Sequence, residues 1–130
     1  MAANVKITQI NWEPDIAYHL AKAAGSKECL DNVAEEVKRG LAQLWQITGE
    51  SSGYLVTRVE REPSGEREMV LVLGEGKGAK AVIGWAVELA NNHGIKKMRT
   101  HITRPGLKKI YENLGWHQRE IVMEWGGYGQ

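Results

Sequence analysis

A glycine-rich run, Leu73–Lys80 (Leu-Gly-Glu-Gly-Lys-Gly-Ala-Lys), has a composition suited to binding an anion. It follows a continuous apolar stretch and precedes a helical pattern, so its glycines allow a tight turn with accessible backbone amides. The helix N-terminus adds partial positive charge, and an anion such as a pyrophosphate can dock there. The spacing matches neither a P-loop nor the dinucleotide-binding fingerprint. A sharp strand-to-helix turn that needs glycine for its backbone angles is an equally good interpretation.

A second segment, Arg104–Trp116, carries a tyrosine on a predicted helix. Tyr111 lies four residues after Leu107 and three before Leu114, so the three side chains share one apolar stripe. Aromatic residues on such stripes usually pack in the core. From spacing alone, we therefore expect Tyr111 to pack there with its hydroxyl at the rim.

The histidines and the single cysteine indicate no metal site. No His-x-x-x-His or Cys/His spacing argues for zinc. His101 follows a predicted strand, where we expect it to be partly exposed. Cys29 has no partner cysteine, which excludes an internal disulfide and favours a reducing compartment. The four histidines are His19, His93, His101 and His117.

The overall charge argues against a nucleic-acid binder. The chain has 17 lysines and arginines against 16 aspartates and glutamates, a formal net charge of +1. A dedicated nucleic-acid binder usually carries a clear basic excess, because it must replace the counterions of the phosphates. The local excess of basic residues at 96–109 is expected to be a solvated face of one strand and one helix.

The length and hydropathy of the chain predict one domain without a membrane span. Its 130 residues fit a single domain (1–130, with 126–130 as a loose tail) that buries a core without disulfides or metals. No apolar run approaches the ~20 residues needed to cross a bilayer. The first residues lack the features of a signal peptide. We therefore expect a cytoplasmic protein that contacts no membrane.

Apolar periodicity and turn residues define the elements that must position these groups. A short strand near Val5–Ile10 precedes two helices, at 16–24 and about 30–39, each followed by a glycine. Residues 43–73 then read as three strands of an antiparallel meander, because β-forming runs alternate with Gly- and Pro-containing turns.

The second half of the chain alternates strands and helices. The strongest helical pattern covers 79–92, and a strand is expected at 95–102. Pro105 opens another helix that ends at Gly115, and the alternation at 117–125 predicts a last strand. The order β-α-α-β-β-β-α-β-α-β predicts an α/β (α+β) domain, a mixed sheet with helices on both faces.

The end of the last predicted helix resembles a known family. Tyr111–Trp116 (Tyr-Glu-Asn-Leu-Gly-Trp) resembles the Tyr-Glu-Lys-Leu-Gly-Phe ending of the last conserved helix in GNAT acetyltransferases. The element order is similar over nearly the whole chain, and the residue-level likeness covers about 74–116. The resemblance implies a GNAT-like fold and the acetyl-CoA-dependent acylation of an amine on a small molecule or protein.

The resemblance also implies a cofactor site. In the family, a Gln/Arg-x-x-Gly-x-Gly/Ala turn binds the pyrophosphate of acetyl-CoA through backbone amides. Gly76 and Gly78 match its two small positions, whereas Leu73 stands where Gln or Arg is expected. The implied cofactor-binding residues are Leu73, Gly74, Gly76, Lys77, Gly78 and Ala79.

The catalytic groups follow from the same resemblance. Tyr111 corresponds to the helix tyrosine that often protonates the departing thiolate, as a general acid near the sulfur can. The base is usually a carboxylate, or a water held by one, on the central strands. Glu60, Glu68 and Glu75 are the candidates, and no motif chooses among them.

A second function stays open beside catalysis. Short GNAT-like proteins also occur in bacteriophages and prophages, sometimes as virion or accessory proteins, and this chain is similar to those in its overall look. A catalytically inactive protein of this shape would act through protein partners or as a homo-oligomer, and would be virion-associated in a phage. The leucine at position 73 and the lack of a clear base favour this hypothesis. Trp12 and Trp125 are its candidate contact residues.

Overall fold

The computed structural model describes residues 4–102, 104–123, 125 and 126. In that part of the chain, five strands form one mixed sheet in the order β1-β2-β3-β4-β5. Neighbouring strands from β1 to β4 are antiparallel, and β5 runs parallel to β4. The strands are β1 (Val5–Ile10), β2 (Gln43–Gly49), β3 (Ser52–Arg61), β4 (Arg67–Lys77) and β5 (Lys97–Thr100).

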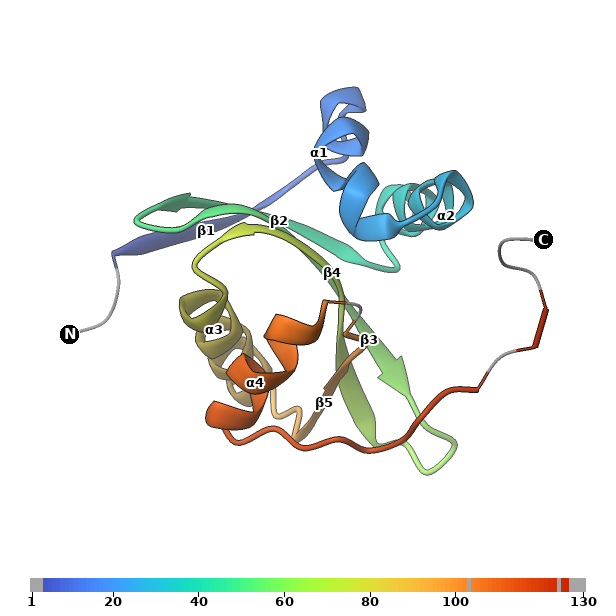
Figure 1. The fold of residues 1–130 in the computed structure, drawn as a ribbon, viewed down its shortest axis with the longest axis vertical. Helices are drawn as coiled ribbons and strands as arrows, with labels where there is room; N and C mark the ends of the chain where they lie inside the picture. The colour runs from blue at the N-terminus through green and yellow to red at the C-terminus, as the bar shows by residue number, and fades with distance from the viewer. Residues whose placement is uncertain (1–3, 103, 124, 127–130) are drawn as a thin grey trace.

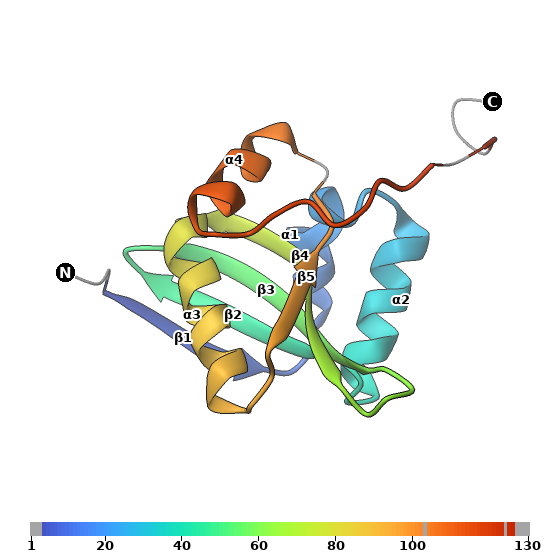
Figure 2. The same ribbon diagram turned by 90° about the horizontal axis from the view of Figure 1, so that it is seen from below.

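Helices cover both faces of the sheet. α1 and α2 lie together on one face, and α3 and α4 lie on the other (Figures 1 and 2). The predicted mixed α/β fold is confirmed, and the element order agrees with the prediction as far as α4. The helices are α1 (Pro14–Ala24), α2 (Lys27–Lys38), α3 (Ala79–Asn92) and α4 (Pro105–Asn113).

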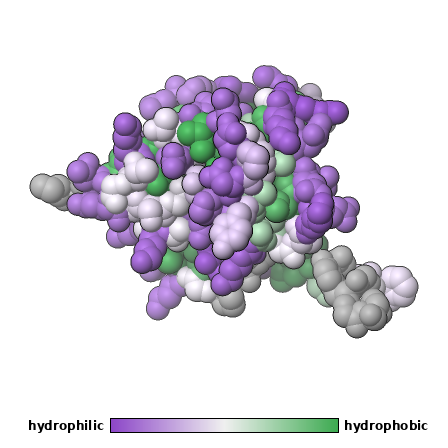
Figure 3. Space-filling model, turned by 90° about the horizontal axis from the view of Figure 1, so that it is seen from above, coloured by the Kyte–Doolittle hydropathy of each residue, from purple (hydrophilic) through white to green (hydrophobic). Residues whose placement is uncertain are grey.

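Alternation along the strands sends apolar side chains into two cores, one on each face. Leu55 and Met69 pack under α3 and α4. Leu44 and Val56 pack with Leu20 of α1 on the other face, and all three are fully buried. The outer surface on the α1–α2 side is mostly hydrophilic (Figure 3). Among the described helices, none is long and apolar enough to span a membrane.

Residues at the ends of α1 and α2 explain where these helices begin or end. Pro14 occupies the first turn of α1, where its missing N–H costs no hydrogen bond, and Gly25 ends the helix in the left-handed region at φ 79°. Ser26 caps α2, because its Oγ accepts a hydrogen bond from the Cys29 N–H at 3.1 Å.

Trp12, predicted to be an exposed contact residue, is instead half-buried against the α1–α2 core.

The glycine-rich run is not the turn that the sequence predicts. β4 continues through it to Lys77, and it stays paired with β3, with Ser52 opposite Lys77 and Gly53 opposite Gly76. The two facing glycines make this pairing possible, since a Cβ on Gly76 would overlap the Ser52 carbonyl oxygen. The strand-to-helix turn is reduced to Gly78, which has a φ of 84° and immediately precedes α3.

A β-bulge bends β4 where it leaves β5. Val56 pairs with Leu73 and Thr57 pairs with Leu71, so Val72 is an extra residue on β4. The pairing of β4 with β5 ends at the same place, with Leu71 opposite Thr100. Bulges bend the strand that carries them. Beyond Leu71, β4 therefore follows β3 and separates from β5.

The predicted last strand is absent from the described residues of 117–125. Those residues lie outside helices and strands, and the side chains of Ile121, Met123 and Trp125 are exposed to 73%, 87% and 97%. An alternating pattern forms a strand only when a neighbouring strand accepts its hydrogen bonds, and the described chain offers none on this path. Of the predicted tail at 126–130, residues 127–130 lie outside the described part.

Candidate functional site

A cleft of about 290 Å³ opens where β4 and β5 separate, and we call it the β4–β5 cleft. Its walls come from β4 at Leu71–Lys77 and from the end of β5 and the residues after it, Thr100 to Ile102. The N-terminal half of α3 and the side of α4 close it on one face of the sheet. Ala23, Ala24 and Cys29 reach it from the α1–α2 side. The bulge at Val72 thus creates a cavity that passes between two strands of the sheet.

The edge of β4 in this cleft has free backbone groups. Beyond Leu71, no strand within the described residues pairs with the side of β4 that faced β5. Backbone N–H and C=O groups that a ligand removes from water need a new hydrogen-bond partner. An extended ligand with amide groups would supply those partners, in the way that a peptide adds to a sheet edge.

The N-terminus of α3, at one end of this cleft, leaves backbone amides without partners in the helix. Gly78 gives the helix no side-chain cap, and the first turn contains no acidic residue. The Val82 N–H bonds to the Gly78 carbonyl, so the amides at positions 79–81 precede the first intrahelical bond and stay unpaired within the helix. Lys77 and Lys80 are exposed beside them. Free amides, the helix dipole and two lysines favour a phosphate at this position.

All the predicted cofactor-binding residues except Gly78 line the β4–β5 cleft. Gly78 is not among the lining residues, and a Cβ there would overlap the Oγ of the buried Ser51. Gly76 also has a structural requirement for glycine, with a φ of 128° and the close approach of β3. Both glycines are therefore required by packing, whether or not a ligand binds beside them.

Tyr111 belongs to the core and to the cleft at once. It is 9% exposed, and its ring packs edge to face against Trp116 with the centroids 4.8 Å apart. It also lines the β4–β5 cleft near Thr100. Burial raises the pKa of Tyr111, and the Thr100 hydroxyl partly opposes that shift. The phenol therefore keeps its proton at neutral pH, and Tyr111 lines the cleft in its protonated form.

Glu60 and Glu68 lie elsewhere, at the opposite end of β3 and β4. They face each other in the β3–β4 register, and Arg99 forms ion pairs with both. The hydrogen bond from Arg99 lowers the pKa of Glu60. Burial would raise the pKa of Glu68, but hydrogen bonds from Arg99 and Arg119 bring it below its ordinary value. Neither carboxylate lines the β4–β5 cleft.

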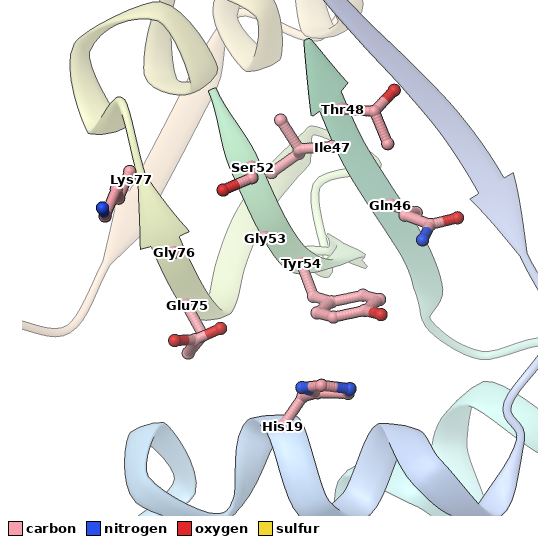
Figure 4. Close-up of a pocket in the computed structure, with 10 residues that line it drawn as sticks. All are labelled: His19, Gln46, Ile47, Thr48, Ser52, Gly53, Tyr54, Glu75, Gly76 and Lys77. Atoms are coloured by element: carbon pink, nitrogen blue, oxygen red, sulfur yellow. The ribbon is translucent and has the colours of Figure 1, made fainter. Parts of the chain in front are cut away.

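Glu75, the third candidate base, lines a second cavity on the other face. This α1-side pocket has a volume of about 570 Å³ and lies between α1 and the ends of β2, β3 and β4. Glu75 is the register partner of Tyr54, and the His19 ring stacks on Tyr54 with centroids 5.2 Å apart. Figure 4 shows these three side chains turned toward the same space between the sheet and α1.

The β4–β5 cleft and the α1-side pocket meet along the end of β4. Ile47, Tyr54, Glu75, Gly76 and Lys77 line both cavities. Within the described residues, Glu75 has no ion-pair partner. The exposed carboxylate of Glu75 is thus available to a ligand in either cavity.

His19 and Tyr54 were not found from the sequence. They are far apart in the chain, and neither belongs to a motif. Only the packing of α1 on the sheet brings them together. The exposed His101 and the half-buried Cys29 line the β4–β5 cleft. In the part of the chain that the structure covers, no three His, Cys, Asp or Glu residues are grouped to hold a metal.

Solved acetyltransferase structures are similar to this fold over nearly their whole length. A GCN5-related N-acetyltransferase from Ralstonia eutropha JMP134 has a TM-score of 0.69 and 14% identity, covering 95% of this chain and 100% of that chain. A ribosomal-protein-alanine N-acetyltransferase from Brucella melitensis biovar Abortus 2308 has a TM-score of 0.68 and 18% identity, covering 94% of this chain and 99% of that chain. A predicted acetyltransferase with acetyl-CoA from Clostridium acetobutylicum has a TM-score of 0.67 and 12% identity, covering 94% of this chain and 96% of that chain.

The chain therefore has the fold of the GCN5-related N-acetyltransferases (the GNAT fold), as the sequence resemblance implied. No protein-family model matches the sequence, and no curated protein is significantly similar to it. At identities of 12–18%, the likeness to the three structures establishes the fold. The chemistry must be argued from the cleft and the pocket.

Proposed function

We propose that the protein is an acetyl-CoA-dependent N-acyltransferase. The observation that carries this proposal is the meeting of two cavities at Glu75–Lys77, one lined by Tyr111 and the other by His19. A transfer between two substrates needs both of them at one point, and holding them there supplies much of the rate acceleration.

The β4–β5 cleft suits acetyl-CoA, which supplies the acyl group as an activated thioester. The free amides at the start of α3 and the side chain of Lys77 bind the phosphates. The unpaired edge of β4 binds the amides of the extended arm. Leu73, which replaces the Gln or Arg of the family pattern, is half-buried and contributes apolar surface. Backbone amides thus carry most of the phosphate contact.

The α1-side pocket suits the acceptor amine. An amine must lose a proton to act as a nucleophile, and Glu75 is the carboxylate placed to accept it, directly or through one water. Tyr111 lines the other cavity, where it donates a proton to the departing thiolate. The two proton transfers therefore use groups on opposite faces of β4. Glu60 and Glu68 have no part in this scheme, because Arg58, Arg99 and Arg119 hold them in ion pairs.

Calorimetric titration with acetyl-CoA tests the proposal. We expect micromolar binding that Lys77→Ala weakens, while Lys38→Ala, which removes an exposed lysine from the far end of α2, leaves it unchanged. Bulky residues at Gly76 or Gly78 are unsuited to this test because they would disturb the packing of β3 and β4. Binding justifies a screen of amine acceptors.

A protein-binding role without catalysis, in a phage particle or elsewhere, is the second candidate function. The exposure of Trp125 favours it, since a free tryptophan side chain is a typical contact residue. This role predicts no binding at millimolar acetyl-CoA. The same titration therefore separates the two functions.

A further inference from the structure

The floor of the α1-side pocket is a polar part of the sheet. On this face, the apolar side chains of Leu44 on β2 and Val56 on β3 pack in the α1–α2 core. Because side chains on one face recur every second residue, the next positions on the same strands are Gln46 and Tyr54. Both line the pocket together with Glu75 of β4. The face of the sheet therefore turns from apolar to polar at the pocket.

Gln46, Tyr54 and Glu75 form one row across three strands, which we call the polar row. Gln46 is the register partner of Tyr54, and Tyr54 is the register partner of Glu75. Two strand spacings, roughly 10 Å, separate the ends of the row. Figure 4 shows the row facing His19 of α1. A small ligand with a nitrogen at Glu75 can therefore reach Tyr54 and Gln46 with its other atoms.

The pocket offers more amide, hydroxyl and imidazole groups than charged ones. The first kind comes from His19, Gln46, Thr48, Ser52 and Tyr54, and the charged groups are Glu75 and Lys77. Among the described residues, no hydrogen bond joins the side chain of His19, Gln46 or Ser52 to another group of the protein. A ligand that displaces their water must supply donors and acceptors of its own. A hydroxyl group is both, so several hydroxyls match this set.

The charges of the pocket suit a single ammonium group. Among the described residues that line it, Glu75 is the one acidic residue, and Lys77 adds a positive charge two residues further along β4. A polyamine carries several ammonium groups, and Lys77 would repel the second of them. The ligand that fits these charges has one amine.

The floor presents side chains and not a free backbone edge. β3 is hydrogen-bonded to β2 on one side and to β4 on the other, so its backbone groups are already paired. An extended peptide binds where a strand edge is free. An alkyl amine would leave the amide and hydroxyl groups of the pocket without partners. Both classes fit this floor less well than a compact amine that carries hydroxyls.

We propose that the acceptor is a compact primary amine with several hydroxyl groups, of the amino-sugar class. This inference rests on the proposed function and names the substrate of the same site. The amine lies at Glu75, and the hydroxyls bind Tyr54 and Gln46. As the new C–N bond forms, the C–S bond of the thioester breaks, Glu75 takes a proton from the amine, and Tyr111 gives one to the sulfur.

A panel of four amines tests this class, with release of the CoA thiol as the readout. The amines are glucosamine, cyclohexylamine (a six-membered ring without hydroxyls), spermidine and a short alanine peptide, each at the same concentration of unprotonated amine. We expect kcat/KM for glucosamine to exceed each of the others by at least about tenfold, because several hydrogen bonds distinguish it. An equal or faster reaction of any other amine in the panel overturns the inference.

Gln46→Leu tests the polar row itself. The substitution removes the amide at similar volume, so the ratio of kcat/KM for glucosamine to that for cyclohexylamine should fall about tenfold, mainly through KM. Gln9→Leu is the matched control, because Gln9 is exposed on β1 and lines neither cavity. Its ratio should equal that of the wild type. A ratio that Gln46→Leu leaves unchanged overturns the inference.

Calorimetric titration with acetyl-CoA separates this inference from the proposed function. Acetyl-CoA binding without turnover of glucosamine overturns the acceptor class alone. No binding at millimolar acetyl-CoA overturns the proposed function, and the acceptor class falls with it.

Discussion

Gly53 on β3 and Gly76 on β4 face each other so closely that neither position has room for a side chain. A Cβ on Gly53 would overlap the Glu75 carbonyl oxygen, and a Cβ on Gly76 would overlap that of Ser52. Both residues also have positive φ, at 143° and 128°. This contact lets β3 and β4 stay paired past the bulge, and it places Glu75 at the junction of the two cavities.

The first prediction concerns this glycine pair. Gly76→Ala should lower the free energy of unfolding by about 1–3 kcal/mol, because alanine is strained at this φ and its Cβ forces the strands apart. Urea unfolding monitored by tryptophan fluorescence measures it. Gly84→Ala is the matched control, since Gly84 lies in α3 with open space around it. This substitution should raise the free energy of unfolding by about 0.5–1 kcal/mol. Equal effects of the two substitutions would contradict the role of the close approach.

A buried threonine on β3, Thr57, lies beside the bulge in β4. The Thr57 hydroxyl accepts a hydrogen bond from the Trp45 Nε1–H at 2.9 Å and donates one to Gln43 Oε1 at 3.0 Å. Thr57→Val keeps the shape but leaves both partners unsatisfied, so we expect a loss of about 1–3 kcal/mol in the free energy of unfolding. Thr48→Val, whose hydroxyl makes one long, exposed bond to the Lys6 carbonyl, should change it little. A neutral Thr57→Val would show that water replaces these bonds.

The ion pairs of Glu60 and Glu68 make stability depend on pH. Both carboxyls have pKa values below the ordinary 4.5 in the folded protein, so the folded state favours their charged forms. Their contribution is complete above 4.5 and is lost as the pH falls through the lowered folded pKa values. The free energy of unfolding, measured from pH 7 downward, should decrease once the pH drops below 4.5. Glu68→Gln should lower the free energy of unfolding at pH 7 and should also reduce its dependence on pH below 4.5. Glu88→Gln, on an exposed part of α3, should change neither. A slope that Glu68→Gln leaves unaltered would assign the acid sensitivity to other groups.

The general-acid role of Tyr111 is tested by removing its hydroxyl. Tyr111→Phe should slow turnover by roughly 10²-fold while acetyl-CoA binding is kept, because the ring still packs against Trp116. The raised pKa means that the wild-type tyrosine loses its proton only as the pH rises above the ordinary 10.0, so its contribution persists through neutral and mildly alkaline pH. Tyr18→Phe, on the exposed face of α1, should leave turnover as it is. Unchanged turnover in Tyr111→Phe would remove the residue from the mechanism.

Much of the fold follows from local sequence signals, because periodicity and caps act over a few residues. Pro14, Gly25 and the apolar stripe of α3 are of this kind, and they placed the helices correctly. The extension of β4 to Lys77 depends on Gly53, which lies far away in the sequence, and glycine composition alone suggested a turn.

The choice among the three glutamates shows the same limit. Glu60, Glu68 and Glu75 all lie on β3 or β4, and their sequence contexts do not distinguish them. The register and the positions of Arg58 and Arg99 place two of them in ion pairs at one end of the sheet. Which carboxylates form ion pairs depends on the sheet register and on residues such as Arg99 that are distant in the sequence. Only the structure therefore distinguishes Glu75 from the other two.

The last prediction follows from that separation. Glu75→Gln should lower turnover by roughly 10²-fold at neutral pH, because the amide cannot accept the proton of the acceptor amine. Acetyl-CoA affinity and the free energy of unfolding should stay unchanged, since Glu75 is exposed and has no ion-pair partner among the described residues. Glu60→Gln is the matched control on β3, and it should lower stability while turnover at a permissive temperature is kept. Steady-state kinetics beside urea unfolding measures both effects. The reverse result, with turnover lost in Glu60→Gln and kept in Glu75→Gln, would move the base to the other end of the sheet and leave the α1-side pocket without a catalytic role.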